Sequence, residues 1–344
     1  VTFLFLYIYE YKKKNLKNNK MIASRSPLRI SLGGGGTDLP SYYKRFGGYL
    51  LAGTIDKYIY INIAKTFNKK FILKYSKLEI VNNIDKIKHP LFREILKYFR
   101  IKTPLNISSH ADIPSGTGLG SSGCFSVTLI NALTRLTNKN LSKRQIAELA
   151  CKIEINILKE PVGKQDQYTS TFPGINEFIF KKNGFVEIKK LNLNEKVLKN
   201  LSKNFTMYFT GYSRKSYKIL KKQNQYTNFQ NIEMINNLHR VKDLAKNFKK
   251  CLIKNDLNQY GLLMDDHWKL KKKRSGNMSN KKINYLYDYA KDNGAIGGKL
   301  IGAGGGGFFL FCSKNSNYLE KQMKKKGLNK TSFKFSYDGP KIIY

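Results

Sequence analysis

The chain has 344 residues, of which 41% are hydrophobic, so it is long enough to bury a sizeable core in one large or two medium domains. This composition excludes a disordered protein. The formal net charge of +40 comes from 63 Lys and Arg against 23 Asp and Glu. The lysines are spread along the chain with many Asn, Ile, Tyr and Phe, which indicates a bias of base composition. We therefore expect no specific nucleic-acid partner, and nucleic-acid binding stays open as an alternative of another class.

The first residues form a short apolar run that is followed by Lys12, Lys13 and Lys14. The run is too short to span a bilayer, and a signal peptide would carry its positive charge before the apolar residues. We expect residues 1–20 to be an arm or an extension outside the domain that starts at Met21, with a membrane anchor as the less favoured alternative. The four cysteines lie far apart without a C-x-x-C pair, which fits a reducing, cytoplasmic location.

The first half of the chain alternates strands with helices. Residues 22–32 are typical of a strand, and a glycine turn follows at 33–36. Residues 49–64 alternate well enough for one or two strands. A loop rich in Gly, Ser and Pro then spans residues 110–123.

Two helices are expected after this loop. Apolar residues recur at helical spacing between positions 121 and 136. Ser142 and Gln145 form a capping-box pattern that starts a second helix. This helix should continue through Glu154 until Pro161 ends it.

The second half begins after a polar stretch at residues 191–204, which is a candidate domain boundary. A strand is expected at 205–209, then mostly helix, and finally two strand-like pieces around the glycines at 302–307. This order predicts an α+β protein with one domain over residues 21–200 and another over residues 201–344.

The strongest chemical signal is the segment directly before the first expected helix. Its residues are Pro114, Ser115, Gly116, Thr117, Gly118, Leu119, Gly120, Ser121, Ser122 and Gly123. Glycines let the backbone approach a ligand closely, and the free N–H groups of a helix start attract a phosphate anion. The two serine hydroxyls could add a phosphate contact and a Mg²⁺ ligand. The segment is not a Walker A loop, because no Gly-Lys-Ser/Thr follows, and a flexible connector is the alternative reading.

The pattern Pro-x-Gly-x-Gly-Leu-Gly-Ser-Ser resembles the ATP-binding signature of the superfamily of galactokinase, homoserine kinase, mevalonate kinase and phosphomevalonate kinase. Residues 26–33 and 299–308 resemble two further motifs of this superfamily, in the same order, so the resemblance covers nearly everything from Met21 onward. It implies a ribosomal protein S5 domain 2-like N-terminal domain, a ferredoxin-like C-terminal domain, and ATP and Mg²⁺ as cofactors. It also implies close backbone support of the phosphate loop by Gly304, Gly305 and Gly306, for which a plain tight turn is the alternative.

Catalytic roles follow from the same resemblance. Ser122 and Glu154 would hold Mg²⁺, which prefers hard oxygen ligands beside phosphates, and Asp166 would take the proton of the substrate hydroxyl. Arg29 matches the basic residue of the first motif and would offset charge beside Asp166 and on the transferring phosphoryl group. Taken alone, Asp166 could instead cap a turn, and Glu154 could face solvent.

Three segments resemble the D-glycero-D-manno-heptose 7-phosphate kinases within the superfamily: the turn Gly-Gly-Gly-Thr-Asp-Leu-Pro, residues 209–214 and residues 267–272. Galactokinases and mevalonate kinases carry Gly-Glu-His after the first strand, which this chain lacks. The resemblance implies ATP-dependent phosphorylation of the anomeric hydroxyl of heptose 7-phosphate, on the way to nucleotide-activated heptose for lipopolysaccharide or capsule.

The expected substrate-binding residues are Gly35, Gly36, Thr37, Asp38, Asp166, Arg214 and Lys271. The Asp38 carboxylate can accept sugar hydroxyls, and Arg214 or the basic stretch 269–274 could bind the sugar phosphate, unless these charges are simply solvated. A fucokinase-like or other sugar 1-kinase is the second candidate, and a catalytically inactive regulator is the third. We expect no membrane partner, and the enzyme could form a homodimer.

Overall fold

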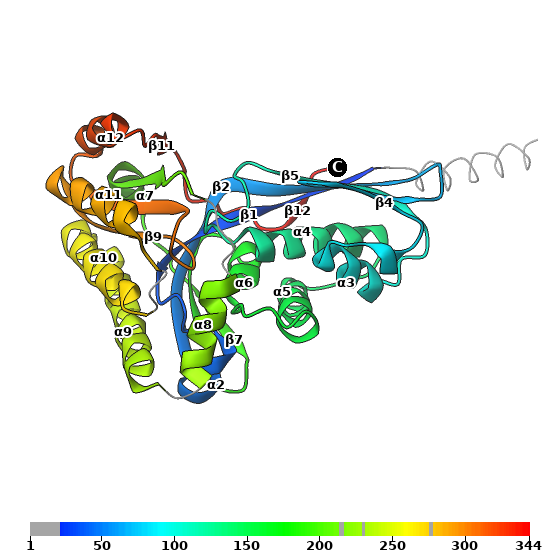
Figure 1. The fold of residues 1–344 in the computed structure, drawn as a ribbon, viewed down its shortest axis with the longest axis horizontal. Coiled ribbons are helices and arrows are strands. Elements are labelled where there is room, and N and C mark those ends of the chain that lie inside the picture. Colours follow the sequence, from blue (N-terminus) through cyan, green and yellow to red (C-terminus); the bar gives the residue numbers. More distant parts are fainter. Residues whose placement is uncertain (1–20, 213–216, 229–230, 275–277) are drawn as a thin grey trace, which may run out of the picture.

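The structure is a computed structural model that describes residues 21–212, 217–228, 231–274 and 278–344. Residues 1–20 and Arg214, for which the sequence made predictions, lie outside the described residues. Figure 1 shows two parts, one built on a large sheet with α3, α4, α5 and α6 on one side of it, and one in which α10, α11 and α12 lie beside a smaller sheet. Helix α9 lies next to α10 and also packs on β1 and β2 of the large sheet. The α+β class expected from the sequence is confirmed.

The strands are β1 Ile22–Gly33, β2 Gly48–Lys65, β3 Phe71–Lys74, β4 Leu78–Val81, β5 Leu105–Ala111, β6 Ile175–Phe180, β7 Val186–Lys190, β8 Phe205–Phe209, β9 Ala295–Leu300, β10 Phe308–Ser313, β11 Lys330–Thr331 and β12 Lys341–Ile342. The helices are α2 Pro40–Phe46, α3 Pro90–Tyr98, α4 Ser121–Leu136, α5 Lys143–Cys151, α6 Gln165–Thr171, α7 Glu195–Asn204, α8 Tyr217–Asn228, α9 Ile232–Lys254, α10 Leu257–Lys272, α11 Lys281–Asp292 and α12 Ser316–Lys325. A 3₁₀ turn, η1, spans Ile84–Lys86, and a π-helical turn, η2, spans Lys152–Ile157.

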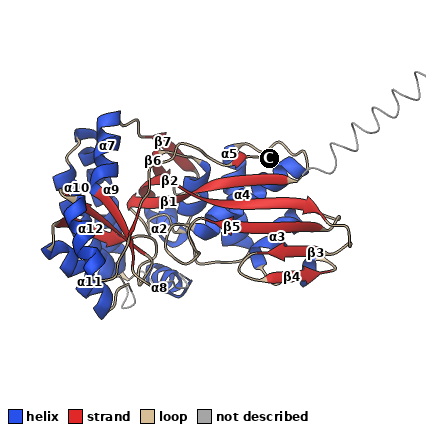
Figure 2. Ribbon diagram, turned by 90° about the horizontal axis from the view of Figure 1, so that it is seen from above, coloured by secondary structure: helices blue, strands red, loops and turns tan. Residues whose placement is uncertain are grey.

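The first sheet has the path β12-β1-β2-β5-β3-β4, and β6 and β7 branch from β2. Strand β2 is a single long strand, and its two ends have different neighbours. Its first residues pair with β6, and its last residues pair with β5 (Figure 2). The long strand β2 therefore connects the β6–β7 pair to the rest of the sheet.

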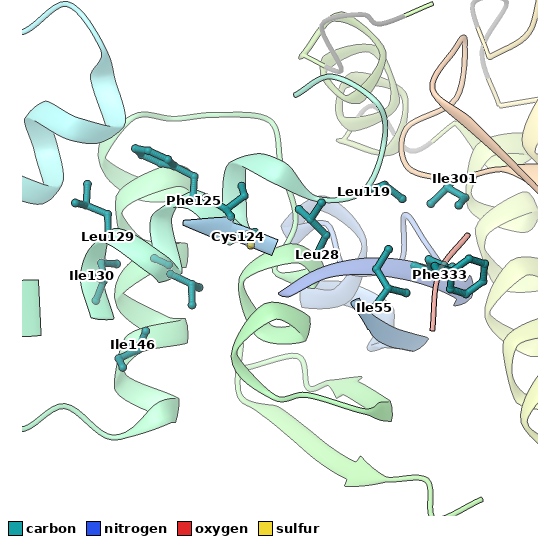
Figure 3. Packing of buried hydrophobic residues seen from close by; sticks show 14 of the residues in the cluster. Leu28, Ile55, Leu119, Cys124, Phe125, Leu129, Ile130, Ile146, Ile301 and Phe333 are labelled. Carbon is teal, nitrogen blue, oxygen red and sulfur yellow. The ribbon is translucent and has the colours of Figure 1, made fainter. Parts of the chain in front are cut away.

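Helix α4 packs its apolar side on this sheet. Cys124, Phe125 and Leu129 lie in the main core cluster together with Leu28 of β1 and Ile55 of β2 (Figure 3). Each of these side chains is nearly or fully buried, and such burial stabilises a fold by about 25 cal/mol per Å² of apolar surface. This packing holds the N-terminal end of α4 in place against the sheet.

Helix α5 begins where the sequence predicts, because the capping box of Ser142 and Gln145 is formed on both sides. The expected continuous helix through Glu154 is wrong in detail. After Cys151 the chain changes to the π-helical turn η2, whose wider ring carries Glu154. Such turns are rare, and their cost is commonly tolerated at functional sites.

The second sheet is antiparallel with the order β11-β8-β10-β9. The polar stretch that the sequence marked as a boundary is mostly helix α7, which begins at its cap Asn194 and buries Val197 and Leu201. Its polarity reflects an exposed helix face and not a linker. The division of the chain between residues 200 and 201 stays a prediction.

The end of the chain returns to the first sheet. Strand β12 pairs with β1, and Phe335 forms an isolated bridge with Ile55 of β2. Phe333 enters the main core near Ile301, as Figure 3 shows. No helix among the described residues is long and apolar enough to cross a membrane.

Candidate active site

A cavity of about 640 Å³ lies where the two parts meet, and it brings most of the predicted site residues together. Its wall includes the phosphate loop before α4, the glycine turn after β1, the start of α6, and residues of α10 and β9. Among the predicted residues at the wall are Arg29, Ser122, Glu154, Asp166 and Asp38. Residues more than a hundred positions apart in the sequence thus share one site.

The phosphate loop is fixed through its own backbone. Gly118 has φ +92°, and a Cβ atom at this position would lie 2.4 Å from the Ile301 carbonyl oxygen. The Phe308 N–H donates to the Thr117 carbonyl oxygen at 3.1 Å, and the Arg29 N–H donates to the Leu119 carbonyl oxygen at 3.1 Å. Only glycine permits this approach of two chain segments.

The C-terminal glycine segment therefore contacts the phosphate loop, but through different members than expected. A Cβ atom on Gly302 would lie 2.6 Å from Gly118, and one on Gly307 would lie 2.2 Å from the Thr117 carbonyl oxygen. The predicted members, Gly304, Gly305 and Gly306, lie between these two glycines in the middle of the turn. The Gly305 N–H donates to the Met278 carbonyl oxygen at 2.6 Å, and Gly304 packs against Met278.

Asp166 lies in the first turn of α6 and pairs with Arg29 of β1. Its Oδ1 atom accepts from Arg29 Nε at 2.8 Å, from Arg29 Nη2 at 2.7 Å and from Gln165 Nε2 at 3.1 Å. The Oδ2 atom accepts no hydrogen bond from the described residues. Arg29 also donates to the Gly118 carbonyl oxygen at 2.5 Å, so one side chain joins the phosphate loop to Asp166. The turn-capping alternative for Asp166 finds no support in these contacts.

Glu154 is only 1% exposed, so the solvent-facing alternative is wrong. Ser122 donates to its Oε2 atom at 2.6 Å, and Gln167 donates to its Oε1 atom at 2.9 Å. Burial raises the pKa of Glu154 to about 7, although these hydrogen bonds act in the opposite direction. The sequence did not single out Gln167 as a partner, and its position beside Asp166 in α6 was the available signal.

The residues fit a Mg²⁺ ion held partly by phosphate oxygens. A serine hydroxyl and a carboxylate offer hard oxygen ligands, and Mg²⁺ is commonly bound by one or two carboxylates plus substrate phosphates. The Ser121 hydroxyl is buried without a hydrogen-bond partner among the described residues, so it is available to donate to a phosphate oxygen. The described residues contain no group of three His, Cys, Asp or Glu that could hold a metal alone.

The glycine turn after β1 is tied to α6 by Asp38. Its Oδ1 atom accepts from the Gly36 N–H at 3.0 Å, and its Oδ2 atom accepts from the Gln165 N–H at 3.1 Å. Burial, followed by the charge of Asp166, raises the pKa of Asp38. Thr37 is not brought to the cavity, because its buried hydroxyl donates to carbonyl oxygens within the turn and on β2.

Lys271 is buried at the cavity wall and is not a solvated surface charge. Its Nζ atom donates to the carbonyl oxygens of Leu300 at 2.7 Å and Gly302 at 2.6 Å, so it holds the end of β9 and the glycine segment. Two further buried residues line the cavity near it, His267 and Lys299, and no role was predicted for either from the sequence.

Three features surround this one cavity: a glycine-rich loop at a helix start, a buried carboxylate–serine pair and an Arg–Asp pair. Together they are typical of a nucleotide-dependent phosphotransferase in which a carboxylate serves as the general base. The GHMP kinases N terminal domain matches residues 62–174, and the GHMP kinases C terminal domain matches residues 245–325. The chain belongs to the GHMP kinases and is an ATP-dependent kinase.

Three known proteins illustrate the similarity. D-glycero-alpha-D-manno-heptose 7-phosphate kinase of Campylobacter jejuni is 33% identical, over 94% of this chain and 98% of that protein. The bifunctional fucokinase/GDP-fucose pyrophosphorylase of Arabidopsis thaliana is 27% identical, over 84% of this chain and 30% of that protein. The crystal structure of a D-glycero-D-manno-heptose 1-phosphate kinase from Bacteroides thetaiotaomicron superposes with a TM-score of 0.77 at 24% identity, covering 94% of this chain and 99% of that one.

Proposed function

We propose that the enzyme transfers the γ-phosphoryl group of ATP to the anomeric hydroxyl of D-glycero-D-manno-heptose 7-phosphate and forms the 1,7-bisphosphate. The main support for phosphoryl transfer is the Asp166–Arg29 pair. It faces a cavity that is also lined by the phosphate loop and by the glycine turn, whose sequence resembles that of the heptose-phosphate kinases. The 33% identity to a heptose 7-phosphate kinase over nearly the whole chain supports the substrate. The product would serve synthesis of nucleotide-activated heptose for surface polysaccharide in the cytoplasm.

The nucleotide phosphates would bind at the start of α4. Backbone N–H groups of the loop and the unpartnered Ser121 hydroxyl are the donors, and the positive end of the helix dipole favours the anion. Ile59, His89, Ala111 and Phe125 line the cavity in its less polar part and would surround the adenine ring. These adenine contacts were not predicted from the sequence.

Ser122 and Glu154 would hold Mg²⁺, and the ion would neutralise phosphate charge during transfer. For that role Glu154 must be ionised and its hydrogen bond from Ser122 must open. Gln167 would keep the other carboxylate oxygen in place. Because burial raises the pKa of Glu154, a cation bound beside this carboxyl would stabilise its ionised form.

Asp166 would act as the general base. The sugar hydroxyl oxygen forms a bond to the γ-phosphorus, the bond from this phosphorus to the bridging oxygen of ADP breaks, and the hydroxyl proton passes to Oδ2 of Asp166. Oδ2 is available because Arg29 and Gln165 donate only to Oδ1. Arg29 would also offset charge on the phosphoryl group in transit.

Product identification tests the proposal. With ATP, Mg²⁺ and heptose 7-phosphate, ³¹P NMR should show a new signal with the coupling of an anomeric phosphate, in equal amount to ADP. A phosphate on another carbon, or ATP consumption without any sugar product, would contradict it. The similarity to a fucokinase makes L-fucose the second candidate, and the same assay with fucose tests that reading.

A further inference from the structure

Three basic side chains form a buried basic cluster on one wall of the cavity: His267 of α10, Arg274 just beyond α10 and Lys299 of β9. Burial, followed by the charge of Lys299, lowers the pKa of His267 well below its usual value, so this imidazole is neutral. Lys299 is 2% exposed, His267 is 4% exposed and Arg274 is 5% exposed. Buried Lys and Arg side chains are rare unless an anion is paired with them.

The protein itself provides little for these groups to bind. Lys299 Nζ donates to the Leu32 carbonyl oxygen at 2.7 Å and lies 5.6 Å from the centre of the Phe248 ring. An ammonium has three N–H donors, so this single hydrogen bond leaves donors for a ligand. Arg274 donates to Asn237 Oδ1 at 3.0 Å and to the Gly35 carbonyl oxygen at 2.8 Å, and its buried Nη2 atom has no hydrogen-bond partner among the described residues. Within the same part of the chain, both ring nitrogens of His267 also have none.

No ion pair joins the cluster to an Asp or Glu in the part of the chain that the structure describes. Asp38, the acidic group that acts on Arg274, already accepts two backbone N–H groups. Burial and the charges of Arg274 and Arg29 lower the pKa of Lys299 to about 7. Arg274 and Lys299 are thus buried close to each other without an ion pair among the described residues, which lowers stability and which a purely structural role does not require.

The cluster has a defined place relative to the proposed reaction. Arg274 donates to the main chain of the glycine turn, which is the expected sugar-binding segment. Lys299 is close enough to both Arg274 and Arg29 for their charges to act on it, so it lies near the turn and near the catalytic pair. A group bound here would belong to the sugar side of the cavity, while the nucleotide phosphates occupy the start of α4.

We propose that Arg274 and Lys299, together with His267, bind the phosphate monoester that the sugar substrate already carries. This assignment rests on the proposed function, and it names a phosphate subsite that selects phosphorylated over neutral sugars. A dianion would accept hydrogen bonds from Arg274 Nη2, from the remaining Lys299 N–H groups and from an N–H of His267. Lys271 would act differently, because its Nζ holds two carbonyl oxygens of the protein.

A kinetic comparison of two sugars tests the subsite. In Lys299→Met, kcat/KM for heptose 7-phosphate should fall about a hundredfold, whereas kcat/KM for the unphosphorylated heptose and the KM for ATP should change less than about threefold. Arg274→Gln also loses the hydrogen bond to the Gly35 carbonyl oxygen, so its measure is the ratio of kcat/KM for the phosphorylated over the neutral sugar, which should fall about a hundredfold. An equal loss with both sugars, or a rise only in the KM for ATP, would overturn the assignment.

Two matched controls lie elsewhere in the protein. Lys242 also donates through Nζ to main-chain carbonyls, of Phe46 at 3.0 Å and Gly47 at 3.3 Å, but lines a separate cavity. Arg144 donates to the Val186 carbonyl oxygen at 2.8 Å. Lys242→Met and Arg144→Gln should leave the preference for the phosphorylated sugar unchanged.

Stability separates binding from a structural role. Lys299→Met removes a buried charge, and the Leu32 carbonyl oxygen keeps a hydrogen bond from Tyr260 at 3.4 Å, so the Tm should stay the same or rise. A lysine that only supports the fold would lower the Tm on replacement. If Arg274→Gln folds poorly, Arg274→Lys keeps the charge and should retain part of the sugar preference.

A binding experiment is independent of which sugar is turned over. The chain has only four histidines, so the ¹⁵N signals of His267 can be assigned. With the nucleotide site filled by Mg²⁺ and a non-hydrolysable ATP analogue, inorganic phosphate should shift the His267 nitrogens in the wild type and in Lys242→Met, but not in Arg274→Gln. This shift supports the subsite even if another sugar proves to be the substrate. No shift at saturating phosphate would overturn it.

Discussion

The two oxygens of the Asp166 carboxylate have different surroundings, and this difference argues for its role. Oδ1 receives all the hydrogen bonds from Arg29 and Gln165, which leaves Oδ2 for the substrate hydroxyl. In Asp166→Asn an amide replaces the base, so kcat should fall at least about a hundredfold while nucleotide affinity stays nearly constant. Steady-state kinetics and binding of an ATP analogue measure the two quantities.

Asp338 provides a matched control for this substitution. It forms an Arg–Asp pair with Arg25 at 2.9 Å, but on the surface away from the cavity. Asp338→Asn should keep wild-type turnover. Activity of Asp166→Asn within a few-fold of the wild type would remove Asp166 from the mechanism.

If Glu154 holds Mg²⁺ as proposed, the affinity of the enzyme for the ion should depend on pH. Its pKa is raised to about 7, so the metal-free enzyme holds a proton on this carboxyl below pH 7. An ion must displace that proton, so Mg²⁺ affinity should weaken by up to about tenfold for each pH unit below 7 and level off above it. The same raised pKa affects folding. Between pH 4.5 and 7 the folded state holds this proton and the unfolded state does not, so the free energy of unfolding of the metal-free enzyme falls as pH rises through this range.

Glu154→Gln is the reference for this measurement, because the nucleotide titrates in the same range. The ratio of Mg²⁺ affinities, wild type over Glu154→Gln, should rise from pH 6 to pH 8 and then remain constant. A ratio that does not change between these pH values would show that Glu154 does not bind the metal.

At the scale of elements, the phosphate loop depends on the strand-to-strand turn after β9. A side chain on Gly118 would collide with the Ile301 carbonyl oxygen, so Gly118→Val should displace the loop and abolish binding of an ATP analogue. Gly327 also has a positive φ, of +75°, but nothing lies within 4 Å of its Cβ position. Gly327→Val therefore controls for the cost of the backbone conformation and should bind nucleotide normally. Normal binding by Gly118→Val would place the nucleotide elsewhere.

Elements with strong local signals could be predicted from the sequence. Helix α4 spans the predicted residues, because its apolar spacing and the glycine before it depend on neighbours in the chain, and the capping box of Ser142 forms as expected. The π-helical turn at Glu154 could not be predicted, since it depends on contacts with Ser122 and Gln167 from other elements.

The buried basic residues near the expected sugar site also could not be predicted from the sequence. The sequence marked residues 269–274 as one basic stretch, but only Lys271 and Arg274 of its basic residues are buried, while Lys269 is exposed. Lys299 was part of a glycine motif without a role of its own. Which lysines are buried depends on how α10 and β9 pack beside β1, and this packing joins residues far apart in the sequence.

At the scale of the whole molecule, neither sheet alone contains the site. The first sheet and its helices supply Arg29, Glu154 and Asp166, and the second part supplies Lys299 and the glycine segment that holds the phosphate loop. The return of β12 to β1 further joins the chain end to the first sheet. The large net charge gave no information about this arrangement, since the functional cations are a few buried ones.

The specificity of the wild-type enzyme tests the central claim most directly. The measurement is kcat/KM for heptose 7-phosphate compared with free mannoheptose, fucose and galactose under the same ATP and Mg²⁺ conditions. Two charge-assisted contacts to a phosphate are worth enough for a preference of about a hundredfold or more for the 7-phosphate. Equal or better turnover of an unphosphorylated sugar would contradict the assigned substrate and leave only the kinase family in place.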